Sequence, residues 1–275
     1  MFTKAAVLTA LTAAAFAVAA PAQAETAATT VLPGANMEAV LKAAQIDPRR
    51  ADDTQTPGAH DSVLLVEQAL QAKGLLDSQY VDGYFGTTTI TAYSQYQKSL
   101  GYTGLDASGL PGKTSLEKLG EGRYTVTNPI SAGSQVTYHG KTLNTRTKAM
   151  LVAAEGIYGS QVTLTQGSYN PGGVDASAGT HDGGGAMDIS VSGISSANRT
   201  KLLTALRKVG FAAWLRTPPS FDYHIHAMAI SDPDLSSGAQ HQTGDYYLGM
   251  NGLQGRGPDD GPQVTKVTWE EYQRG

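Results

Sequence analysis

Apolar positions in the first half of the chain recur at the spacing of a helix. Val63, Val66 and Leu70 are three and four residues apart, which places their side chains on one helical face. Glycine-containing turns at 82–86 and 106–112 follow, and each precedes another stretch of helical character. We therefore predict a small bundle of three helices in residues 61–120.

The second half of the chain mixes strand-like and helix-like patterns. Asn144 is placed to begin one helix, and Ser195 or Ser196 to begin another that Gly210 ends. Because strands and helices are mixed rather than strictly alternating, residues 136–252 are predicted to form an α+β domain with an antiparallel sheet. The predicted strands cover 161–166, 186–191, 211–215 and 223–230.

Three stretches lack a sustained periodic pattern. They are a flexible N-terminal segment at 25–60 with one short helix near 37–44, a linker at 121–135 and a C-terminal tail at 253–275. Their Pro, Gly, Ser, Thr and Asp residues are typical of loops. We expect the first stretch to be a tether, the second to connect the two domains and the third to be a loosely attached tail.

The first 24 residues have the pattern of a secretory signal peptide. Lys4 supplies a positive charge, residues 5–20 are apolar, and a small-residue cleavage site ends at Ala24. The apolar run is short for a membrane span, and no later run reaches the length needed for one. We therefore expect cleavage near Ala24 and an exported mature chain without a membrane span. The alternative, a buried Ala-rich helix, is less consistent with this order of features.

Composition narrows the function further. Only 16% of the 275 residues are charged and the net charge is −4, which argues against nucleic acid as a partner because such binding relies on Lys and Arg. The chain has no cysteine, so disulfides and thiol chemistry are excluded. Stability must come from packing or from a bound metal.

Histidine and aspartate gather at two places in the predicted sheet. His181 precedes three consecutive glycines that lead to Asp188, and those glycines let the loop fold back on the strand. In a later strand Asp222, His224 and His226 alternate with other residues and would point to one face. Such nitrogen and oxygen ligands suit Zn²⁺ with one position open. An H-x-H pair can also be a surface feature, and a glycine run can bind phosphate, although this run leads into a strand rather than a helix.

The helical segment at 61–120 resembles the peptidoglycan-binding domain type 1, a three-helix module that docks on bacterial cell-wall glycopeptide. The resemblance implies bacterial peptidoglycan as a partner, although the same Asp, Thr and Gly residues also serve as helix caps and turn formers. The matching positions are Asp82, Gly83, Phe85, Gly86, Thr89, Ala92, Tyr93, Tyr96 and Gln97, with a looser second turn at Asp106, Gly109, Gly112 and Thr114.

The His-containing motif also has a counterpart in a known family. It resembles the pattern H-x-x-G-x-A-x-D of zinc D-alanyl-D-alanine carboxypeptidases and L-alanyl-D-glutamate endopeptidases, which share their fold with the hedgehog signalling domain. The resemblance implies that His181, Asp188 and His226 bind Zn²⁺. The matching positions are His181, Gly184, Ala186 and Asp188, with His226 as the last His of an H-x-H strand.

The position of the general base departs from the family pattern. Family members commonly place a carboxylate three residues before the last ligand, where this chain has Tyr223. Asp222 would be roughly 13 Å from His226 along an unbent strand at ~3.3 Å per residue. His224 is about half as far away and on the same face. We therefore expect His224 beside the zinc site, with Asp222 orienting it, acting as the base, or serving only the strand.

A second departure concerns the substrate. Family members commonly carry Gly-Tyr-Arg after the first strand, the Arg binding a substrate carboxylate, whereas residues 167–170 here read Gly-Ser-Tyr-Asn. Nothing else nearby supplies the cation, since the next arginine is Arg199. This difference favours cleavage of an internal bond, or no turnover.

Together these features predict a secreted, monomeric, peptidoglycan-binding zinc metallopeptidase that hydrolyses an amide bond in cell-wall stem or cross-bridge peptides. One alternative is a non-catalytic wall-binding protein that retains its zinc site. Another is a zinc peptidase that acts on protein outside the wall.

Overall fold

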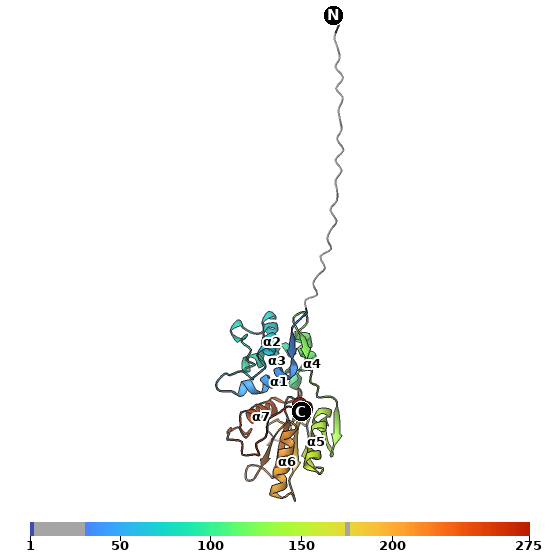
Figure 1. Ribbon diagram of the computed structural model, residues 1–275, viewed down its shortest axis with the longest axis vertical. Coiled ribbons are helices and arrows are strands. Elements are labelled where there is room, and N and C mark those ends of the chain that lie inside the picture. The colour runs from blue at the N-terminus through green and yellow to red at the C-terminus, as the bar shows by residue number, and fades with distance from the viewer. Residues whose placement is uncertain (3–30, 174–176) are drawn as a thin grey trace. The chain divides into compact units, whose positions relative to one another are not determined.

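The computed structural model describes residues 1–2, 31–173 and 177–275 (Figure 1). The predicted signal peptide at 1–24 lies outside these residues, apart from its first two. Over the part of the chain that is described, every helix is too short or too polar to cross a membrane.

The three helices predicted for residues 61–120 are present, and the helix predicted near 37–44 precedes them. A short parallel pair of strands, β1 (Gly34–Asn36) and β2 (Thr125–Thr127), joins the two ends of this region. Asn36 caps the first helix, because its side chain accepts hydrogen bonds from the next turn's backbone amides. The helices are α1 (Met37–Ile46), α2 (His60–Ala72), α3 (Thr87–Ser99) and α4 (Lys113–Leu119), with 3₁₀ turns η1 (Asp47–Arg49), η2 (Ser78–Tyr80) and η3 (Gly104–Ala107).

The second half contains an antiparallel sheet with the strand order β5-β6-β8-β7. The predicted α+β class with an antiparallel sheet is therefore confirmed. Asn144 and Ser195 cap their helices as predicted. The elements are β3 (Gln135–Tyr138), β4 (Lys141–Asn144), α5 (Thr145–Tyr158), β5 (Leu164–Gln166), β6 (Ala186–Ser190), α6 (Ser196–Lys208), β7 (Phe211–Arg216), β8 (His224–Ala229), α7 (Ser237–Tyr247) and α8 (Trp269–Arg274).

The two faces of this sheet have different roles. One face packs against α5 and α6, and its strand residues include Ile189, Phe211 and Ile225. On the other face, Trp214 and Met228 belong to the core that contains α1 and α7. Because side chains alternate along a strand, the polar residues at positions 188 and 226 share this second face. The candidate site is thus built beside a buried apolar core.

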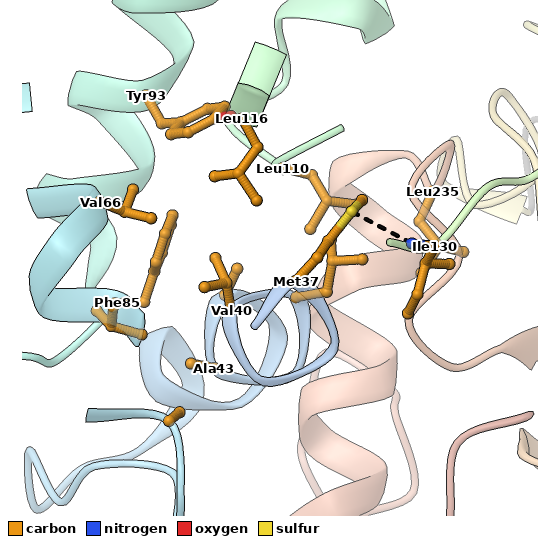
Figure 2. Packing of buried hydrophobic residues seen from close by; sticks show 14 of the residues in the cluster. Met37, Val40, Ala43, Val66, Phe85, Tyr93, Leu110, Leu116, Ile130 and Leu235 are labelled. Carbon is orange, nitrogen blue, oxygen red and sulfur yellow. Dashed lines mark hydrogen bonds between the residues drawn. The ribbon is translucent and has the colours of Figure 1, made fainter. Parts of the chain in front are cut away.

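The N-terminal segment predicted to be flexible is built into the fold from Gly34 onwards, so that prediction is wrong there. The short helix predicted at 37–44 is confirmed as part of α1, and its apolar face is fully buried. Figure 2 shows this face between the other helices and the residues Ile130 and Leu235. The backbone amide of Ile130 donates a hydrogen bond to the Met37 sulfur. The face itself includes Val40 and Ala43, and the surrounding residues include Val66, Phe85, Leu116, Ile130 and Leu235.

A buried carboxylate fixes the end of this segment. Asp47 is fully buried at the end of α1, and its oxygens accept hydrogen bonds from Thr56 and from the backbone amide of Phe85. Burial raises the pKa of Asp47, although these hydrogen bonds oppose the shift. The segment is therefore attached through a polar contact as well as through the apolar face of α1.

The predicted linker and tail are also packed into the fold, and the prediction of a loosely attached tail is wrong. Linker residues form β2, and Tyr124 and Ile130 are each 3% exposed. In the tail, Asp259 forms two hydrogen bonds with Arg207, and Glu270 forms two with Arg146. Residues 32–275 form one compact unit. The division into domains at 61–120 and 136–252 stays a prediction.

The C-terminal helix also contacts the first one. Glu38 and Lys42 of α1 form ion pairs with Arg274 and Glu271 of α8, respectively. These ion pairs are partly exposed, so each contributes little to stability. They place the first and last helices of the described fold side by side.

A second buried carboxylate organises the turn of the helical region. Glu67 accepts hydrogen bonds from the backbone amides of Asp82 and Gly83 and from the Thr89 hydroxyl. Burial raises the pKa of Glu67 to about 7, and the hydrogen bonds only partly oppose this shift. The turn at 82–86 therefore rests on a carboxyl group that changes charge near neutral pH.

We expect the stability of the protein to fall between pH 4.5 and about pH 7 because of Glu67. Its pKa is higher in the folded than in the unfolded chain, so its stabilisation is complete below pH 4.5 and is lost as the pH rises to about 7. At about 1.4 kcal/mol per pKa unit, the effect is at most about 3 kcal/mol. Urea unfolding of the wild type and of Glu67→Gln across this pH range measures it. An equal slope in both proteins would contradict the prediction.

Candidate metal centre

The sheet register places three polar side chains in one row. Gln166 of β5 pairs with Asp188 of β6, which in turn pairs with His226 of β8. Residues paired across antiparallel strands point to the same face. The sequence alternation in these strands, apolar on one side and polar at these positions, is thus what brings them together.

His181 reaches this row from the loop before β6. The backbone amides of Tyr169 and Asn170 donate hydrogen bonds to the carbonyls of Gly183 and His181, which hold the loop against the end of β5. A side chain at Gly183 would place its Cβ 2.2 Å from the Asp234 carbonyl oxygen. Glycine is therefore required for this close approach, which turns His181 towards the sheet face.

The three predicted metal ligands converge. Asp188 Oδ1 lies 2.7 Å from His226 Nδ1 and 3.3 Å from His181 Nε2, and the two imidazole nitrogens are 3.3 Å apart. One ligand atom from each residue lies within 4.8 Å of the others. The described structure therefore contains a buried His-Asp-His group that could hold a metal ion.

Contacts on the far side of each imidazole support this arrangement. His181 Nδ1 lies 2.9 Å from the Gly167 carbonyl oxygen, and His226 Nε2 lies 3.0 Å from Gln242 Oε1. Both partners are acceptors, so each outer nitrogen carries the proton and each inner nitrogen presents its lone pair to the centre. Metal-binding imidazoles are usually oriented in this way.

The charge states fit the same interpretation. Burial favours the neutral form of Asp188, but its close contacts with the imidazoles of His181 and His226 outweigh burial and lower its pKa. Burial lowers the pKa of His226, although Asp188 opposes the shift. A carboxylate and neutral imidazoles are the forms that bind a divalent cation. The residues present therefore fit a metal such as zinc.

His224 lies beside this group, as predicted. Its Nε2 is 3.7 Å from Asp188 Oδ1, and its Nδ1 donates a hydrogen bond of 2.7 Å to the Asp222 backbone carbonyl. Nε2 therefore faces the cluster as an acceptor. The ring is partly exposed, with 19% side-chain exposure, so a substrate can reach it.

The structure does not bring the Asp222 side chain into the site. β8 begins at His224, so the strand alternation that would have aimed Asp222 at the sheet face does not extend to it. Asp222 is exposed, and its carboxylate is not among the groups that line the pocket around the His-Asp-His group. Its contact with His224 is made by the backbone, which orients the ring. A role for its carboxylate as the base has no support from this geometry.

A charged residue of the pocket was missed from sequence. Arg216 of β7 pairs with His224 and lines the same pocket of about 260 Å³ as the three ligands. Its Nη1 donates to the Asn251 carbonyl, whereas its buried Nη2 has no hydrogen-bond partner. Burial lowers the pKa of Arg216 to about 10, with Asp188 opposing the shift, so it stays a cation at neutral pH.

The prediction that no cation lies near the site is therefore wrong. The guanidinium of Arg216 stacks over the rings of Trp214 and Phe221, which fix its position. The strand was predicted to end at Leu215, one residue too early, and its register with β8 is not visible in the sequence. The sequence did offer one indication, because Trp214 and Arg216 are two residues apart and therefore share a face if the strand continues to Arg216.

Comparison with protein-family models, with curated proteins and with solved structures found no match to this chain.

Proposed function

We propose that the chain is an exported zinc peptidase that hydrolyses an amide bond next to a free carboxylate in bacterial cell-wall peptides. The observation that carries the proposal is that one pocket contains both the His-Asp-His group and the Arg216 guanidinium, whose Nη2 has no hydrogen-bond partner. The resemblance of the His181–Asp188 motif to cell-wall carboxypeptidases and endopeptidases supports zinc as the metal and a wall peptide as the substrate.

His224 is the group best placed to move protons. When bound by His181, Asp188 and His226, zinc would act as a Lewis acid on the scissile carbonyl and make a water reactive near neutral pH. His224 Nε2 would take the proton from the attacking water, because its Nδ1 proton is held by the Asp222 carbonyl. The nearby Asp188 carboxylate stabilises the imidazolium, and Nε2 then gives its proton to the leaving amine.

Arg216 determines which amide bond of the substrate is placed for hydrolysis. A buried cation with a free N–H is suited to a carboxylate, which accepts charge-assisted hydrogen bonds. A carboxylate in a pocket of this size would place the amide bond of the last residue near the metal group. The arrangement therefore favours removal of a C-terminal residue over cleavage of an internal bond, in contrast to the expectation from sequence.

The helical region supports the choice of substrate only by resemblance. Residues 61–120 would retain the enzyme on peptidoglycan and raise the local concentration of wall peptides. A non-catalytic wall-binding protein with a zinc site remains the second candidate. The position of His224 beside the metal group favours the enzyme, because binding to the wall alone does not require it.

The proposal is tested with zinc-loaded protein and two peptides, an N-acylated peptide that ends in D-Ala-D-Ala and its C-terminal amide. We expect chelator-sensitive release of the last residue from the free acid and a loss of about tenfold to a hundredfold in kcat/KM for the amide. Arg216→Met should reduce cleavage of the acid to the level of the amide. Digestion of purified peptidoglycan, followed by mass spectrometry, shows whether the wall is a substrate.

Two outcomes would contradict the proposal. If neither the peptides nor peptidoglycan gave chelator-sensitive products, the proposed peptidase activity would be rejected. If kcat/KM were equal for the free acid and the amide, the assignment of Arg216 as the carboxylate-binding residue would be rejected. Arg199→Met serves as the control, since Arg199 lies outside the pocket and packs on Tyr223.

A further inference from the structure

We infer that the substrate of the proposed peptidase lies across the sheet, perpendicular to its strands, with the residues before the scissile bond in a second cavity next to the metal pocket. Gln166, at the boundary between the two cavities, donates a hydrogen bond to the backbone of that part of the substrate. The inference rests on the proposed function, and it identifies a binding site that the metal group and Arg216 do not include.

The second cavity has a volume of about 490 Å³ and adjoins the metal pocket directly. Gln166 and Asp188 line both cavities, so the two spaces meet at these side chains. The rest of the second cavity is formed by polar groups of the β3–β4 hairpin and of the chain from β5 onwards. These residues are Gly140, Lys141, Thr142, Thr165, Gly167, Ser168, Tyr169 and Asn170.

The order of the strands gives the two adjoining cavities a direction across the sheet. Gln166 lies on the edge strand β5 and Arg216 on the opposite edge strand β7, while Asp188, His224 and His226 lie on the strands between them. Three spacings of ~4.8 Å separate the two edge strands by roughly 14 Å. This is about the length of four residues of extended peptide. A carboxylate on Arg216 therefore directs the remainder of the substrate towards β5.

The amide of Gln166 provides the second, independent observation. Gln166 is 8% exposed, and its Nε2 is buried without a hydrogen-bond partner. A buried donor without an acceptor is unfavourable in a folded protein, and such groups are rare. A peptide carbonyl that enters from the second cavity would supply the acceptor. Among the described residues that line the metal pocket, Gln166 and Arg216 both have such an unpaired nitrogen, one on each side of the metal group.

The polar lining indicates the chemical class of this part of the substrate. Thr142, Thr165 and Asn170 offer hydroxyl and amide groups, and Lys141 adds a positive charge. Ser168 and Tyr169 are already hydrogen-bonded, to Ala186 and Asp234, and they hold the wall of the cavity in place. The cavity therefore suits a polar peptide backbone rather than an apolar chain.

The test uses a series of peptides that all end in D-Ala-D-Ala and are extended by none, one, two or three residues at the N-terminus. We expect kcat/KM of the wild type to rise at least about tenfold with extension. Gln166→Leu should lose most of this gain, and the loss should appear in KM rather than in kcat. Thr142→Trp, which fills the cavity from an exposed position, should have the same effect even if Gln166→Leu folds poorly. Gln161→Leu, an exposed position just before β5, should keep the full gain.

A binding measurement separates this inference from the proposed function. In metal-free His224→Ala protein, titration with the three-residue extension should shift the backbone amide NMR signals of residues 165–170, and the bare dipeptide should not. If the signals of residues 165–170 shift but the zinc-loaded wild type does not hydrolyse the peptide, the second binding site is supported and the proposed peptidase activity is rejected. If hydrolysis does not depend on the number of N-terminal residues and the signals of residues 165–170 do not shift, the second binding site is rejected and the proposed peptidase activity is supported.

Discussion

Replacing His226 with alanine is expected to abolish metal binding at ordinary metal concentrations. Zinc bound by four protein ligands contributes about 10–16 kcal/mol, so one ligand is worth about 3 kcal/mol or more, a loss of at least about a hundredfold in affinity. In the proposed site His226 is one of three ligands rather than four. The other described His beside the group, His224, cannot replace it, because it directs a single nitrogen at Asp188 from 3.7 Å. Isothermal titration with zinc, together with metal analysis after dialysis, measures the change.

His224→Ala is the matched variant on the same strand. It should bind zinc with nearly wild-type affinity and lose about 10²- to 10⁴-fold in turnover, the usual contribution of a general acid-base group. Gln242→Leu should give a graded result, a loss of about 10- to 100-fold in zinc affinity, because Gln242 only orients His226. Full zinc stoichiometry in His226→Ala, or loss of zinc in His224→Ala, would show that the ligands are assigned wrongly.

Replacing Asp259 with alanine is expected to destabilise the protein more than any change at its surface. Asp259 and Arg207 have side-chain exposures of 1% each and form a paired, two-bond contact. Without the carboxylate, the Arg207 guanidinium would remain buried with only the carbonyls of Ala213 and Pro262 as partners. Leaving one member of a buried ion pair uncompensated costs about 3–5 kcal/mol.

Thermal and urea unfolding measure this loss. For a chain of this size the midpoint should fall by roughly 6–20 °C. The adjacent Asp260 is exposed, so Asp260→Ala should change the midpoint little. Because Asp259 lies in the predicted tail, a wild-type midpoint for Asp259→Ala would mean that residues 253–275 do not contribute to the stability of the fold.

Elements with a local signal were predicted well from the sequence. Asn144 and Ser195 cap their helices because a short polar side chain precedes each apolar stretch, and this needs no knowledge of distant residues. The grouping of His181, Asp188 and His226 followed from a resemblance, and the structure brings these three together.

Features that depend on long-range contacts were not predicted. Arg216 and Gln166 enter the site through strand register, which the sequence does not display. Asp47 and Asp259 attach segments of low apolar content through buried polar contacts, so those segments resembled loops. In each case the missing information was the identity of a partner far away in the chain.

The ion pairs between α1 and α8 have a consequence for the order of folding. Glu38 and Arg274 are 236 residues apart in sequence, so their contact closes nearly the whole of the described chain into a loop. Contacts of such long range form slowly, because the chain must lose much conformational freedom before they form. The first helix of the described residues is therefore expected to complete its surroundings last. Folding intermediates should have the sheet and α2–α4 formed while α1 is still exchanging with solvent.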